Sequence, residues 1–166
     1  KVDYAICYNN LSLKTINSLP SVDILVDQSD YIGIYGDLSP IGPAWKLYPP
    51  RLRTESCEIS LDNDLILYDL PQDLIDFFES DFFLISESYK RSYSGVLERL
   101  IPEHILMNSG FVCLPSGYDY EAELRSVIDE FGIKWNNHFD EQTLVAYIVS
   151  RREHKIVSLK DISECW

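Results

Sequence analysis

The stretch Glu58-Ile59-Ser60-Leu61-Asp62-Asn63-Asp64-Leu65-Ile66-Leu67-Tyr68 places two carboxylates between two short apolar runs. The apolar runs predict two short strands joined by an acidic turn. In extended backbone, residues two apart point to the same side, so Asp62 and Asp64 can aim at one point. Mg²⁺ and Mn²⁺ prefer hard oxygen ligands and keep positions open for substrate phosphates. The stretch therefore indicates either a divalent-cation site or a polar turn with two solvated carboxylates.

Outward from this stretch, short apolar runs alternate with segments of helical spacing. On the N-terminal side, residues 2–8 and 22–26 predict strands and residues 11–19 a helix, which together form a βαβ unit with a parallel pair. The alternation as a whole predicts an α/β fold with a mostly parallel sheet flanked by helices. The remaining predicted elements are a strand at 31–35, a loop at 36–43, a helix opened by Pro49 and Pro50 that contains Arg51 and Arg53, strands at 59–61 and 65–68, a helix at 71–78, a strand at 82–85, a helix at 94–100, a strand at 105–114 interrupted at 108–110, a helix at 120–131 with Asp119 as N-cap, a helix at 141–150 with Asp140 as N-cap, and a strand at 156–159.

Length and composition indicate one globular domain over residues 1–166. Of the 166 residues, 46% are hydrophobic, which is enough for a sizeable core. The formal charge of −13 argues against nucleic acid or an anionic membrane as the main partner. No apolar run approaches the ~20 residues of a membrane span, and no signal-peptide pattern is visible. Four cysteines without a Cys-x-x-Cys pair predict neither a zinc site nor a disulfide framework, so we expect a cytoplasmic, reducing environment.

Four segments in this order resemble motifs of the GT-A-type glycosyltransferases, the Asp-x-Asp family. The match touches most of the chain from Tyr4 onward. It implies a nucleotide-diphospho-sugar transferase fold, as a short member of the family or as a chain that continues beyond Trp166. The matching segments are Ala44-Trp45-Lys46-Leu47 with Pro49-Pro50-Arg51-Leu52-Arg53, then Leu61-Asp62-Asn63-Asp64, then Asn108-Ser109-Gly110-Phe111-Val112-Cys113-Leu114, and finally Asp140-Glu141-Gln142.

The resemblance implies a metal-dependent transfer of a sugar from a UDP- or GDP-sugar to an unidentified acceptor. Asp62 and Asp64 would hold Mn²⁺ or Mg²⁺ against the diphosphate, where the metal neutralises charge on the leaving group. The basic side chains Lys46, Arg51 and Arg53 would steady the same diphosphate. Their alternative role is that of ordinary ion pairs on an acidic surface.

Further donor-binding and catalytic positions follow from the same resemblance. Asn63 belongs to the acidic motif, and Tyr8 ends the first strand, where it either stacks on a nucleobase or packs in the core. Asn108 either binds a sugar hydroxyl or satisfies backbone at a strand break, and Gly110 either admits a ligand or marks a bulge. Asp140 and Glu141 would bind the sugar or act as the acceptor base. As acids in a first helical turn they are also favoured by the helix dipole alone.

Two other functions compete with the transferase. Metal-dependent phosphohydrolases of the haloacid-dehalogenase kind also carry Asp-x-Asp after an apolar strand, but with Thr or Val where this chain has Ile66, and near the N-terminus. A non-catalytic domain of the same fold that binds a nucleotide is the second alternative. The short chain favours this alternative, whereas the intact acidic pair opposes it. A third metal ligand near the C-terminus, often a histidine in the GT-A families, is not evident in this sequence.

Overall fold

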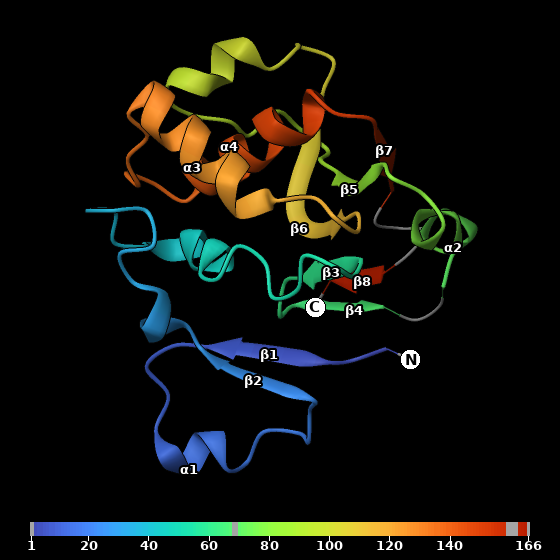
Figure 1. The fold of residues 1–166 in the computed structure, drawn as a ribbon. Helices are drawn as coiled ribbons and strands as arrows, with labels where there is room; N and C mark the ends of the chain where they lie inside the picture. Colours follow the sequence, from blue (N-terminus) through green and yellow to red (C-terminus); the bar gives the residue numbers. More distant parts are fainter. Residues whose placement is uncertain (1, 68–69, 159–162, 166) are drawn as a thin grey trace.

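The computed structural model describes residues 2–67, 70–158 and 163–165, in which strands and helices alternate (Figure 1). Tyr68 and Leu159, which the sequence places at strand ends, lie outside the described residues. The elements are β1 Ala5–Tyr8, α1 Leu13–Ile16, β2 Ile24–Asp27, the 3₁₀ helices η1 Gln28–Tyr31 and η2 Gly42–Leu47, β3 Glu58–Leu61, β4 Leu65–Leu67, α2 Gln72–Phe78, β5 Phe83–Glu87, the 3₁₀ helix η3 Val96–Leu100, β6 Met107–Leu114, α3 Tyr120–Phe131, α4 Phe139–Ser150, β7 His154–Val157 and β8 Ser163–Cys165.

The α/β class is confirmed, but the expectation of a mostly parallel sheet is wrong. A four-stranded mixed sheet has the order β3-β6-β5-β7, and β1-β2 and β4-β8 form separate pairs. Strand β6 runs antiparallel to both β3 and β5, whereas β5 and β7 are parallel. A parallel connection needs a substantial crossover, usually a full helix, and the only helical element described between β5 and β6 is the five-residue η3. Helical spacing in the sequence therefore did not determine strand direction.

Helices cover both faces of the four-stranded sheet, which makes three layers. Alternate residues of β5 and β6, such as Ile85 and Val112, join the core beneath α3 and α4. Their neighbours Leu84 and Cys113 pack on the other face with residues of α2. This division follows from the two-residue period of a strand, which sends successive side chains to opposite faces.

Helix α3 begins and ends where its sequence indicates. The Asp119 side chain accepts a hydrogen bond from Ala122 N at 2.9 Å, so the predicted N-cap is confirmed. Gly132 ends the helix at φ 60°, a left-handed conformation that glycine adopts without strain. Buried Leu124, Val127 and Ile128 form the core-facing stripe.

The predicted parallel βαβ unit is present at the N-terminal end, drawn in blue at the bottom of Figure 1. Its helix α1 spans only Leu13–Ile16 and contains no buried residue. The buried Gln28 fixes this unit to the rest of the chain, because its side-chain amide donates to Trp45 O at 2.7 Å.

Two predicted elements are wrong. Tyr31 ends η1 and residues 32–35 form turns instead of a strand, because Gly33 and Gly36 adopt φ 88° and 72°, outside the strand region. Residues 49–53 form a loop instead of a helix, since proline at position 50 disfavours helical backbone at position 49. The amides of Leu52 and Arg53 donate to the Glu58 carboxylate and not to helical carbonyls.

Candidate functional site

Asp62 begins the tight turn that joins β3 to β4. Its amide continues the β3–β6 pairing by donating to Gly110 O at 2.8 Å, and its carbonyl accepts from Leu65 N at 3.1 Å. Asn63 and Asp64 are exposed within this turn. The acidic motif therefore lies at the end of β3, as the sequence predicts.

Strand β6 has a bulge at the Asn108-Ser109-Gly110 segment, where its pairing with β3 continues to Asp62. Ile85 and Ser86 are consecutive on β5, but their partners on β6 are Val112 and Asn108, so residues 109–111 have no partner on β5. The predicted interruption of this strand is thus a bulge within one continuous element, held by Ser86 Oγ donating to Asn108 O at 2.7 Å. Bulges change the direction in which side chains point, and they are common beside functional sites.

Gly110 allows the close approach of β6 to the acidic turn. A β-carbon at this position would lie 2.9 Å from Asn108 Oδ1 and 3.1 Å from Asp62 Oδ2. The Gly110 amide also donates to Asn108 Oδ1 at 2.7 Å. Any larger residue would push the Asp62 carboxylate or the Asn108 amide out of place.

Lys46, at the end of η2, reaches the same carboxylate from another part of the chain. Its Nζ lies 2.8 Å from Asp62 Oδ1 and 2.9 Å from Oδ2. The same ammonium lies 3.4 Å from Ser109 Oγ and 3.8 Å from Glu141 Oε2. One cation therefore joins the acidic turn, the β6 bulge and the start of α4.

Glu141 is the buried member of this group, with 2% of its surface exposed. Ser109 Oγ donates to Glu141 Oε2 at 2.9 Å. Burial raises the pKa of the Glu141 carboxyl to about 7, against the opposing effects of Lys46 and the Ser109 hydrogen bond. A group with this pKa exchanges its proton near neutral pH. We call Lys46, Asp62, Ser109, Gly110 and Glu141 the Asp62 cluster.

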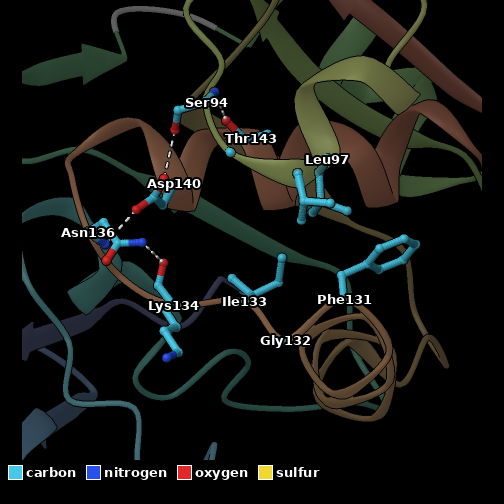
Figure 2. A pocket seen from close by; sticks show the side chains of 11 residues that line it. Ser94, Leu97, Phe131, Gly132, Ile133, Lys134, Asn136, Asp140 and Thr143 are labelled. Carbon is cyan, nitrogen blue, oxygen red and sulfur yellow. Dashed lines mark hydrogen bonds between the residues drawn. The ribbon is translucent and has the colours of Figure 1, made fainter.

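Asp140, the neighbour of Glu141, makes a different set of contacts. Its carboxylate accepts from Ser94 Oγ at 2.7 Å and from the amides of Asn136 and Asn137 at 2.6 and 2.8 Å. Figure 2 shows it at the wall of a pocket of about 240 Å³, turned towards Ser94 and Asn136. The predicted N-cap role is wrong, because α4 begins at Phe139 and Asp140 lies within the first turn, where it orders the preceding loop.

Arg51 and Arg53 have their described hydrogen bonds away from the Asp62 cluster. Arg51 donates to the carbonyl oxygens of Arg53, Ser56, Pro115 and Tyr118, which fastens its loop to the segment after β6. Burial lowers the pKa of its guanidinium. Arg53 pairs with Asp3 near the N-terminus. These contacts give both arginines a structural explanation, and their predicted contact with a diphosphate stays a prediction.

Tyr8 lies half-buried at the end of β1, opposite Asp27 in the β1–β2 register. The next residue, Asn9, donates to Gln28 Oε1 at 3.4 Å, and Gln28 in turn bonds the carbonyl of Trp45. Because Lys46 follows Trp45, the strand end that carries Tyr8 is connected to η2. Its predicted stacking on a nucleobase stays a prediction.

The two carboxylates of the acidic turn suit a cation that takes most of its ligands from substrate phosphates and water. Among the described residues there is no group of three or more His, Cys, Asp and Glu side chains placed to hold a metal. The Asp62 side chain is 30% exposed, and Asp64 is exposed in the same turn. Mg²⁺ and Mn²⁺ are commonly held by one or two carboxylates plus substrate phosphates and water, so Asp62 and Asp64 fit such an ion.

Ser109 is the member of the Asp62 cluster that sequence reasoning missed as a site residue. The strand period of two places Asn108 and Gly110 on one face and Ser109 on the other, so attention goes to its neighbours. The bulge overrides this alternation, and Ser109 Oγ contacts both Lys46 and Glu141. The sequence did contain one signal for Ser109, because this residue lies between the candidate residues Asn108 and Gly110.

No family model, curated protein or solved structure matches this chain. Within the described residues, no helix has both the length and the apolar character needed to cross a membrane.

Proposed function

We propose that this chain is a metal-dependent glycosyltransferase of the GT-A type, which binds a nucleotide-diphosphate sugar and transfers the sugar to an acceptor. One observation carries the proposal. Four segments singled out by their motifs meet in one cluster, in which Lys46 contacts both the Asp62 and Glu141 carboxylates, Ser109 contacts Glu141, and Gly110 lies beside Asp62.

The acidic turn is the proposed metal site. Asp62 and Asp64 would hold Mg²⁺ or Mn²⁺ together with the diphosphate oxygens of a UDP- or GDP-sugar. When bound, the ion supplies charge neutralisation on the departing nucleoside diphosphate. Asp64 is exposed, and the Asp62 side chain is 30% exposed with the Lys46 ammonium as its partner.

The other cluster residues would place and tune the acidic turn. Gly110 keeps the turn close to β6, and Ser109 holds the Glu141 carboxylate beside the Lys46 ammonium. Because Glu141 is buried, we assign it a positioning role, in which it acts on the acidic turn through Lys46 and Ser109. Direct contacts of Asp140 or Glu141 with the sugar or acceptor, and of Tyr8, Asn63 or Asn108 with the donor, stay predictions.

The first test is Asp64→Asn, which removes a carboxylate from an exposed turn position and should leave the fold intact. We expect the substitution to weaken Mn²⁺-dependent binding of UDP or GDP more than tenfold, the effect of losing about 1.5–3 kcal/mol of charged interaction. Titration calorimetry with Mn²⁺, and with a chelator in its place, measures this change. Asp129→Asn removes a carboxylate from the exposed side of α3 and is the matched control.

The outcomes separate the competing functions. Metal-dependent nucleotide binding that Asp64→Asn weakens and Asp129→Asn preserves, together with turnover of a sugar nucleotide, supports the transferase. Binding without turnover of any sugar nucleotide favours the non-catalytic domain, and release of phosphate from a phosphomonoester favours the hydrolase. Equal nucleotide affinities in wild type and Asp64→Asn would remove Asp64 from the site.

A further inference from the structure

The Lys46 ammonium occupies the coordination space of the Asp62 carboxylate. It lies within 2.9 Å of both oxygens, whereas its distances to Ser109 and Glu141 are longer, at 3.4 and 3.8 Å. An ammonium has three donors, and the shortest contacts are both to Asp62. In this arrangement the negative charge of Asp62 is already compensated by the protein.

A divalent cation on Asp62 needs the same carboxylate oxygens that Lys46 contacts. Two like charges cannot share them at contact distance without strong repulsion, which is largest where water is partly excluded. We propose that Lys46 is the resident counter-ion of Asp62 and makes cation binding conditional on the nucleotide. The cation alone must displace an ammonium, whereas a cation that arrives with an anionic diphosphate offers the displaced ammonium a new partner. This inference rests on the proposed function and adds the order in which its ligands bind.

Two further acceptors lie near the Lys46 ammonium. Glu141 Oε2 lies 3.8 Å from the Lys46 Nζ. Ser109 Oγ accepts a hydrogen bond from Nζ and donates one to the same Glu141 oxygen. The flexible four-carbon stem of lysine lets the ammonium move between neighbouring acceptors without backbone change. The backbone below it is held, since Trp45 O accepts from Gln28 and the neighbouring Leu47 is buried. Only the end of the side chain has to move.

The test is Mn²⁺ binding to the nucleotide-free protein, measured from the electron paramagnetic resonance signal of the unbound ion. We expect Lys46→Met to bind Mn²⁺ alone at least tenfold more tightly than wild type. We also expect added UDP to increase Mn²⁺ affinity strongly in wild type and much less in the variant. Lys14→Met, which removes an exposed ammonium from α1, controls for the change in net charge and should match wild type.

A second variant guards against misfolding of the first. Lys46→Met leaves Glu141 without its cationic neighbour, so the double variant Lys46→Met/Glu141→Gln keeps the buried charges balanced, and circular dichroism and melting temperature check the fold. Mn²⁺ affinity equal to that of Lys14→Met in both Lys46 variants would overturn the inference. Absence of Mn²⁺-dependent UDP or GDP binding in wild type would instead overturn the proposed function, while tighter Mn²⁺ binding by the Lys46 variants would still support the counter-ion role.

Discussion

The β1–α1–β2 unit and the layers built on β5, β6 and α4 differ in how their side chains are used. In the first, Val26 is the only residue of the two strands and the helix that is buried, and Leu13 and Leu25 are exposed. In the second, α4 is buried along most of its length, and Leu144, Ile148 and Phe111 are completely buried. The two regions have the same secondary-structure types but very different amounts of core.

This difference explains where the Asp62 cluster is built. Ser109, Gly110 and Glu141 belong to the well-packed region, whose dense contacts hold side chains in defined positions. Tyr8 belongs to the thinly packed region, which is joined to the rest through contacts such as Gln28–Trp45 and Asp3–Arg53. We infer that the charged cluster is preorganised by the core, and that the end of β1 has more freedom to adjust.

The same substitution in two helices gives the sharpest test of the comparison. Leu144→Ala in α4 removes a side chain with 0% exposure, and we expect it to lower the free energy of unfolding by about 2–5 kcal/mol. Leu13→Ala in α1, where the side chain is 78% exposed, should change it by about 0.5 kcal/mol or less. Urea unfolding of both variants measures the two values. Similar losses would mean that the N-terminal unit has a core that the exposures do not reveal.

A second prediction uses the buried charge of the packed region. Burial raises the Glu141 pKa from 4.5 to about 7, so its contribution to stability is present below about pH 4.5 and is lost as the pH rises through about 7. As the pH rises from about 4.5 to 8, we therefore expect the wild type to lose roughly 3 kcal/mol of unfolding free energy relative to Glu141→Gln. Chemical denaturation in a chelating buffer at the two pH values measures the shift.

The control for this pH effect is Asp30→Asn, which removes an exposed carboxylate beside the N-terminal unit. Solvent screens an exposed charge, so removing it should change the free energy of unfolding far less than Glu141→Gln does. A Glu141→Gln difference that stays constant across this pH range would show that the carboxyl is not desolvated in solution.

The smallest expected effects on stability distinguish the two arginines. Arg51 holds a loop against the packed region, and Arg53 pairs with Asp3 of the N-terminal segment. Arg51→Ala removes hydrogen bonds to four carbonyl groups, and we expect a loss of about 2–3 kcal/mol of stability. Arg53→Ala removes an ion pair whose arginine side chain is 44% exposed, and the loss should be much smaller than that for Arg51→Ala because solvent screens the pair. Nucleotide affinity measured on the same samples checks the diphosphate role implied by the sequence, because a structural arginine leaves that affinity unchanged.

Local signals predicted local structure well. The cap at Asp119, the left-handed Gly132 and the spacing of Leu124, Val127 and Ile128 specify α3 without reference to any other element. The acidic turn between β3 and β4 is equally local. Prediction failed for the direction of β6, which long-range packing decides, because hydrophobic spacing carries no information about partners.

The candidate site divides in the same way. By itself, the sequence determined that Asp62 follows a strand and that Gly110 and Glu141 belong to motifs worth comparing. Only the tertiary structure decided that Lys46 meets Asp62, that Ser109 joins Lys46 to Glu141, and that adjacent Asp140 and Glu141 make different contacts. The physical reason is that side-chain chemistry and backbone preference are local properties. Contacts between residues far apart in the chain are selected by the packing of the whole core and by a bulge that reverses the expected alternation of β6.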